Sequence, residues 1–156
     1  MSAQLFVVAT PNGHLDDITY RAIEVLKSVS IIAAEDTRTS AQLLKHFNIS
    51  TPLTACHEHN ESNKIDLLIQ RVLNGENMAL ISDAGTPLIS DPGFKLVRAA
   101  QQHGIRVTPV PGACAAIAAL SSVGLPSDRF SFGGFLPSRQ SQRLIQLEKL
   151  KDETQT

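Results

Sequence analysis

Five times along the chain, a short and mainly apolar run leads into a polar or turn-rich loop and then into a helical stripe of apolar residues. The apolar runs are Leu5–Ala9, Val29–Ala34, Pro52–Cys56, Met78–Ile81 and Ile105–Val110. Runs of this kind are typical of strands that are buried on both faces of a parallel sheet. Their alternation with helices predicts an α/β fold, with a largely parallel five-stranded sheet flanked by helices.

The predicted helices follow from the spacing of apolar residues and from the signals at their ends. We expect the first helix to begin at Asp17, with Asp16 or Asp17 accepting its first N–H groups. The others are expected around Ala41–Phe47, between a cap at Asn60 and a stop at Gly75, from Pro92 at the first helical position to Gly104, and over Ala113–Val123. After Gly124 the pattern changes, with a possible strand at Phe130–Phe135 and a charged helix from Gln140.

The charge balance limits the classes of partner. The chain has 14 Lys and Arg against 15 Asp and Glu, so no overall basic field draws it to nucleic acid nonspecifically. Six Phe, one Tyr and no Trp leave few platforms for base stacking, which disfavours an OB-fold or an RRM. Any contact with RNA must therefore depend on a local surface whose shape fits the RNA.

The cysteines and the apolar segments indicate in which cellular compartment the protein is expected. Cys56 and Cys114 form no C-x-x-C motif, which favours a reducing cytosol over a disulfide scaffold. The apolar stretches are shorter than the roughly 18 residues that a membrane span needs. We expect a cytoplasmic protein that does not bind a membrane.

Four loops follow four of the predicted strands: Thr10–Asp17, Glu35–Ser40, Ser82–Gly93 and Pro111–Ala115. Because the carboxyl ends of parallel strands meet at one edge of a sheet, these loops could line one cleft. None of them matches a phosphate-binding P-loop or G-x-G-x-x-G, which argues against an ATPase or an ordinary dinucleotide enzyme. The small residues of Pro111–Ala115 suit a flat adenine or a carboxylate, or only a close approach of the next helix to the sheet.

Two polar clusters have both a functional and a plain structural interpretation. Glu35, Asp36 and Arg38 could do acid–base work, or could form a helix cap in which Arg38 pairs with one carboxylate. His57 and His59 would point the same way in an extended segment, but a metal site needs further ligands and none is evident. We therefore predict no metal centre.

Five ordered motifs, covering nearly the whole chain, carry a specific resemblance. They are L-F-V-V-A-T-P-N-G-H-L-D-D-I-T at 5–19, A-E-D-T-R-T-S at 34–40, I-S-D-A-G-T-P-L-I-S-D-P-G at 81–93, P-V-P-G-A-C-A-A-I-A-A-L at 109–120 and G-L-P-S-D-R-F-S-F-G-G-F-L-P at 124–137. In these motifs the chain resembles the ribosomal RNA small subunit methyltransferase I family of the tetrapyrrole methylase superfamily. It departs from that family's usual P-T-P-I-G-N-L at Ala9, Asn12 and His14.

The resemblance implies a methyltransferase that uses S-adenosylmethionine to methylate the ribose 2'-hydroxyl of a cytidine in 16S rRNA. It also implies two α/β domains with the cofactor between them, and a homodimer. Residues matching the family's cofactor loops are Pro11, Asp83, Ala84, Gly85, Thr86, Pro87, Leu88, Ile89, Cys114 and Ala115. Because the hydroxyl must lose its proton, Glu35 or Asp36 is the candidate base, with Arg38 holding a phosphate or the neighbouring carboxylate.

The same resemblance divides the chain and leaves two alternatives open. We expect residues 1–124 to form the cofactor-binding domain, and residues 125–156 to be a connector and the start of a truncated C-terminal domain. One alternative is a methyltransferase acting on a corrin or porphyrin. The other is a cofactor-binding or dimerisation module that has no activity by itself.

Overall fold

The computed structural model describes residues 3–56 and 61–153, which divide into two compact units, Met1–Cys114 and Ala115–Thr156. Within the described part of the first unit, five strands form one sheet in which every pairing is parallel. They are β1 (Gln4–Val8), β2 (Ile31–Ala34), β3 (Leu53–Ala55), β4 (Met78–Ile81) and β5 (Arg106–Val110), in the order β3-β2-β4-β1-β5. The predicted five-stranded parallel sheet is confirmed.

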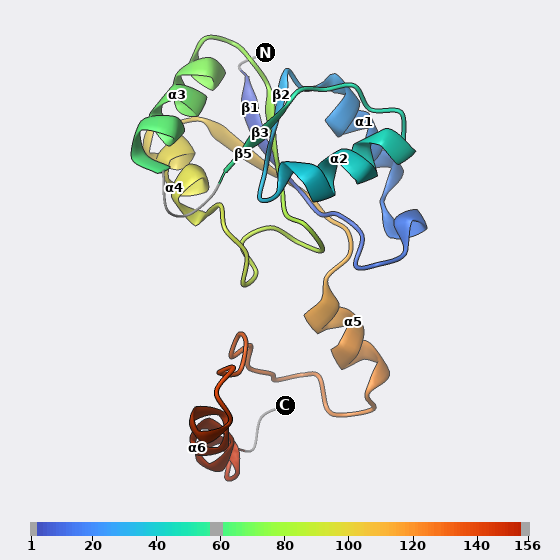
Figure 1. Ribbon diagram of the computed structural model, residues 1–156, viewed down its shortest axis with the longest axis vertical. Helices are drawn as coiled ribbons and strands as arrows, with labels where there is room; N and C mark the ends of the chain where they lie inside the picture. Colours follow the sequence, from blue (N-terminus) through green and yellow to red (C-terminus); the bar gives the residue numbers. More distant parts are fainter. Residues whose placement is uncertain (1–2, 57–60, 154–156) are drawn as a thin grey trace. The chain divides into compact units, whose positions relative to one another are not determined.

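The strand order explains why helices cover both faces of the sheet. From β1 the chain moves toward the β3 edge through α1 (Tyr20–Ser28) and α2 (Thr37–His46), and then returns through α3 (Glu61–Leu73) and α4 (Phe94–Gln102). Because parallel crossovers are right-handed, this reversal puts the second pair of helices on the opposite face. Figure 1 shows α1 and α2 on one side of the strands and α3 and α4 on the other.

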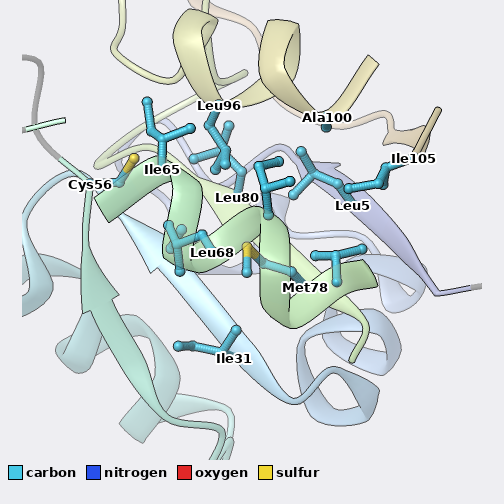
Figure 2. Close-up of a cluster of buried hydrophobic side chains, with 13 residues drawn as sticks. Leu5, Ile31, Cys56, Ile65, Leu68, Met78, Leu80, Leu96, Ala100 and Ile105 are labelled. Carbon is cyan, nitrogen blue, oxygen red and sulfur yellow. The ribbon is translucent and has the colours of Figure 1, made fainter. Parts of the chain in front are cut away.

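The buried side chains form one core on each face. In β2, Ile31 and Ala33 belong to the core under α3 and α4, whereas Ile32 and Ala34 belong to the core under α1 and α2. This division follows from the alternation of side chains along a strand. Figure 2 shows the first core, with Leu68 of α3 and Leu96 of α4 among its labelled members.

Several expected helix ends are wrong. Asp16 and Asp17 lie in a short 3-10 turn, η1 (Leu15–Asp17), and α1 is capped by Thr19, whose side chain accepts from the N–H of Ala22 at 3.1 Å. A hydroxyl at the N-cap satisfies a donor that has no partner within the helix.

The next two helices also begin elsewhere than expected. Helix α2 starts at Thr37 and not near Ala41, because Asp36 caps it, so most of the expected loop Glu35–Ser40 is its first turn. Helix α4 starts at Phe94, after a left-handed Gly93, so Pro92 precedes the cap and is not the first helical residue. The expected cap Asn60 lies outside the described residues.

The second unit contains α5 (Ala115–Ser122) and α6 (Gln140–Leu150), neither of which has a buried residue. The expected strand at Phe130–Phe135 is wrong, since this segment pairs with no strand among the described residues and Phe135 is exposed. None of the helices in residues 3–56 and 61–153 is long and apolar enough to cross a membrane.

Candidate functional site

The loops after β1, β2, β4 and β5 leave the sheet at its carboxyl edge. Strand β4 lies between β2 and β1, yet the helix after β4 covers the opposite face from the helices after its two neighbours. Such a switch opens a crevice outside the carboxyl ends of the strands, where ligands bind in open α/β sheets. The fold therefore places the predicted loops at the position expected for a site.

Thr10 joins the loop after β1 to the loop after β4. Its N–H donates to the carbonyl of Gly85 at 2.8 Å, and the N–H of Gly85 donates back at 3.0 Å. The buried Thr10 hydroxyl also donates to the carbonyl of Ser82 at 3.1 Å. Gly85 has a φ of 77°, and a Cβ there would lie 2.7 Å from Oδ1 of Asn12. A side chain at this position would therefore strain the backbone and force the Asn12 side chain to move.

The loop after β5 is held against the same pair of loops. The N–H of Ala9 donates to the carbonyl of Val110, and a Cβ on Gly112 would lie 2.9 Å from the Cβ of Ala9. The Thr86 hydroxyl donates to the carbonyl of Ala113 at 3.0 Å. These contacts bring Gly85 and Thr86 close to the segment that leads to the half-buried Cys114. Ala115 follows as the first residue of α5 and belongs to the second unit.

The loop after β4 contains two residues with unusual backbone geometry. Leu88 and Ser90 have φ values of 73° and 60°, in the left-handed region that side chains disfavour. Leu88 packs against the core under α3 and α4, Pro87 is buried, and Ile89 is exposed. Strained residues of this kind persist where the surroundings fix them, and they cluster in loops that bind ligands.

Asp36 is held by Arg38 and in turn holds the loop after β4. Its Oδ1 accepts from the N–H of Arg38 at 2.8 Å, and its Oδ2 accepts from Nη2 of Arg38 at 2.7 Å. The Arg38 guanidinium, with the backbone N–H, lowers the pKa of the Asp36 carboxyl from 3.8 to about 2. The N–H of Asp36 donates to Oδ1 of Asp83 at 3.0 Å. Of the two predicted interpretations, this geometry fits the helix cap with Arg38 on the neighbouring carboxylate.

Two further acidic residues lie close to this network. Glu35 precedes Asp36 in the chain, and Asp91 lies near enough to Asp83 to be affected by its charge. Glu35 directly follows the fully buried strand β2 and is half-buried. Burial raises the pKa of Asp91, the nearby Asp83 charge raises it further, and a hydrogen bond from Ser82 opposes both. This edge of the sheet therefore carries one carboxyl group with a lowered pKa, that of Asp36, and one with a raised pKa, that of Asp91.

A cavity of about 320 Å³ lies between α2 and the loops after β1 and β4. Its lining residues are Pro11, Gly13, Leu15, Thr39, Gln42, Leu43, Asp83 and Ala84. Three of these, Pro11, Asp83 and Ala84, were predicted from the sequence. Thr39, Gln42 and Leu43 were missed, although their spacing puts them on one helical face once α2 is known to begin at Thr37.

No cluster of three or more His, Cys, Asp or Glu side chains that could hold a metal ion occurs in the part of the chain that the structure describes. His57, Glu58 and His59 lie outside those residues.

Comparison with known proteins identifies the family. The family model for tetrapyrrole (corrin/porphyrin) methylases matches residues 4–156. A relative from Pseudomonas aeruginosa, named ribosomal RNA small subunit methyltransferase I, is 62% identical over 97% of this chain and 54% of its own length. The relative of the same name from Haemophilus influenzae is 55% identical over the same shares. The chain thus spans about half the length of the curated relatives it matches, and the resemblance in its motifs is confirmed.

Solved structures support the fold. The uroporphyrin-III-C-methyltransferase from Thermus thermophilus has a TM-score of 0.59 and 22% identity, over 81% of this chain and 55% of that one. At 22% identity, this similarity supports the fold alone. Together with the family model, which covers nearly every residue, it leads to one assignment: the chain belongs to the tetrapyrrole (corrin/porphyrin) methylase family.

Proposed function

We propose that this chain is the cofactor-binding part of a methyltransferase that transfers a methyl group from S-adenosylmethionine to the ribose 2'-hydroxyl of a cytidine in 16S rRNA. The observation that carries the proposal is the joining of three loops at the carboxyl edge of the sheet, through Thr10 with Gly85 and Thr86 with Ala113. It occurs in a chain 62% identical to a relative named for ribosomal RNA methylation.

The residues at this edge fit the proposed cofactor. Ala84, Gly85 and Ala113 have small or no side chains, so backbone groups can approach a ligand closely. We propose Pro11, Asp83–Ile89, Cys114 and Ala115 as the binding residues, with Asp83 oriented by the N–H of Asp36. S-adenosylmethionine would supply a methyl group that is already activated by its positively charged sulfur.

Glu35 is the stronger candidate for the base. A carboxyl group with a pKa of about 2 accepts protons poorly at neutral pH, so Asp36 acts better as a positioning residue, with Arg38 fixing its orientation. Glu35 comes one residue earlier, directly after β2. In this proposal Glu35 accepts the hydroxyl proton, and the loops hold the reacting groups in line and away from water.

The proposal extends to the rest of the chain. Residues 1–124 would form the cofactor-binding domain, and residues 125–156 the connector and the beginning of a second domain. The partners would be 16S rRNA in the small ribosomal subunit and a second copy of the protein, which places the activity in the cytoplasm. The exposed apolar residues of the second unit, such as Phe135 and Ile145, are consistent with a segment that is covered by further structure.

Two measurements test the proposal. Titration calorimetry should detect S-adenosylmethionine binding, and Gly85→Ala should weaken it, because a side chain strains the left-handed backbone of Gly85 and displaces the Asn12 side chain. Gly133→Ala is the matched control, since nothing lies within 4 Å of a Cβ there. Transfer of labelled methyl groups to small ribosomal subunits should then be compared for this chain and for a version extended past Thr156.

The outcomes separate the candidate functions. Transfer to a corrin or porphyrin in place of the ribosomal subunit would support the tetrapyrrole alternative. Cofactor binding without transfer by either version would support a binding module that has no activity by itself. Absence of cofactor binding by both versions would contradict the proposal altogether.

A further inference from the structure

The cavity between α2 and the loops after β1 and β4 has the composition of a nucleobase pocket. We propose, on the basis of the proposed function, that this cavity holds the base of the nucleotide to be methylated, and that Gln42 and Asp83 select cytosine over uracil. The structure assigns α2, through Gln42, a part in choosing the substrate, in addition to carrying the cap that orients Asp83.

The size and the walls of the cavity suit one aromatic ring. Its volume of about 320 Å³ is at the lower end of the roughly 300–1,000 Å³ that small-molecule pockets span. Pro11, Leu15 and Leu43 provide apolar walls for the faces of a ring, and Gln42 and Asp83 provide polar groups for its edge. A single base with its sugar fits these dimensions better than a macrocycle of four rings.

The position of the cavity separates it from the loop after β5. The carboxyl ends of the strands follow the order β2, β4, β1, β5. Among the residues that the structure describes, the cavity lining comes from the loops after β1 and β4 and from α2, which follows β2. The contact between Thr86 and Ala113 lies on the β5 side. An adenine bound by the Pro111–Cys114 loop would therefore leave the cavity for the substrate, with Pro11, Asp83 and Ala84 at the boundary between the two ligands.

The polar groups match the pairing edge of cytosine. That edge presents one amino donor and two acceptors, whereas uracil presents a carbonyl oxygen where cytosine has the amino group. An ionised Asp83 only accepts hydrogen bonds, and its Oδ1 is oriented by the N–H of Asp36 at 3.0 Å. Asp83 would attract the amino group of cytosine and repel the carbonyl of uracil, while the Gln42 amide would donate to the remaining acceptors. Unpaired bases in RNA are commonly recognised through this edge.

The test is a titration of the isotope-labelled full chain with cytidine and with uridine, followed by NMR. The side-chain amide signal of Gln42 is assigned by its loss in Gln42→Leu. We expect cytidine to shift that signal and to bind about tenfold more tightly than uridine. Gln42→Leu should weaken cytidine binding and reduce the preference, because the donor to the cytosine acceptors is lost while Asp83 remains. Gln70→Leu, an exposed position on α3, should keep the preference. Calorimetry should give the same S-adenosylmethionine affinity for both variants.

The results distinguish this inference from the proposed function. Equal binding of the two nucleosides, or a Gln42 signal that does not move, overturns the inference and leaves cofactor binding intact. Displacement of cytidine by S-adenosylmethionine would mean that the cavity receives the adenine, which also overturns it. A cytidine preference that depends on Gln42, in a chain that fails to bind S-adenosylmethionine, would support the inference and contradict the proposed cofactor site.

Discussion

Asp36 shows how one carboxylate can connect two loops of a site. It caps α2, pairs with Arg38 and, through its own N–H, holds Asp83. Its pKa is lowered in the folded protein, so the stability it contributes is present above its ordinary pKa of 3.8 and is lost as the pH falls toward about 2. We expect Asp36→Asn to lower the melting temperature at pH 7 and to reduce the further loss between pH 4 and pH 2.

Thermal unfolding measured from pH 7 to pH 2 checks this expectation. Asp66→Asn, at an exposed position on α3, is the matched control and should follow the parent protein. Parallel melting curves for Asp36→Asn and the parent across this range would contradict the contribution assigned to the pair with Arg38.

Asp91 should respond to pH in the opposite sense. Burial, the largest cause, raises its pKa, so the folded state favours the protonated form and stability is lost as the pH rises through the folded-state pKa. Asp91→Asn keeps an acceptor for the Ser82 hydroxyl and removes the charge. It should raise the melting temperature at pH 7 and have little effect at pH 3, and a stabilisation of equal size at both values would refute this account.

Glu35 is the residue on which the proposed chemistry depends most. In the protein extended past Thr156, Glu35→Gln should lower methyl transfer to small ribosomal subunits by roughly 100-fold to 10,000-fold, the usual contribution of a positioned base. Asp36→Asn should have a smaller effect on the rate. S-adenosylmethionine affinity, measured by calorimetry, should be unchanged by Glu35→Gln, and near-normal turnover of that variant would remove Glu35 from the mechanism.

At the scale of elements, the loop after β5 packs closely against the end of β1 because Gly112 has no side chain. Gly112→Ala would place a Cβ 2.9 Å from that of Ala9, and overpacking of this kind costs about 1–3 kcal/mol. The double variant Ala9→Gly, Gly112→Ala should recover much of this loss, whereas Gly133→Ala alone should be nearly neutral. Chemical denaturation measures all three, and failure of Ala9→Gly to recover stability would contradict a direct clash.

The strands were easier to predict than the starts of the helices. The strand β4 is buried along its whole length, so its apolar run marks it in the sequence. The start of α2 consists of polar residues of the kind found in loops, and the side chain of Asp36 caps it by accepting from the N–H of Arg38. The segment Phe130–Phe135 has the composition of a strand but lacks a neighbouring strand with which to pair.

The candidate site was predictable in its loops and not in its contacts. Turn-rich composition singled out Ser82–Gly93, and the parallel sheet implied that this segment would share an edge with Glu35 and Asp36. The hydrogen bond from Asp36 to Asp83 depends on β2 and β4 being neighbours, which no local pattern specifies. Gln42 was missed because its role follows from the start of α2 and not from its own surroundings in the sequence.

At the scale of the whole molecule, the first unit contains the buried core. Every buried hydrophobic side chain in the described residues lies between Leu5 and Val110. A chain of residues 1–114 should therefore unfold cooperatively, with a melting temperature within about 5 °C of the parent. Residues 115–156 alone should show no cooperative transition. Calorimetric scanning of both fragments checks this, and a non-cooperative melt of residues 1–114 would contradict it.

The position of β1 between β4 and β5 affects how the protein can fold while it is being made. Strand β1 is synthesised before the other four strands of this sheet, and it pairs with β4 and β5: Leu5 lies opposite Met78, and Gln4 lies opposite Arg106. At roughly 5–20 residues per second, synthesis takes several seconds to reach those partners. During that interval Leu5 and Val8 have no sheet to enter, so the nascent chain presents an apolar strand to the cell. Strand β1 cannot pair with β5 until residues near 110 have been synthesised. We therefore expect chaperones to bind the nascent chain before that point.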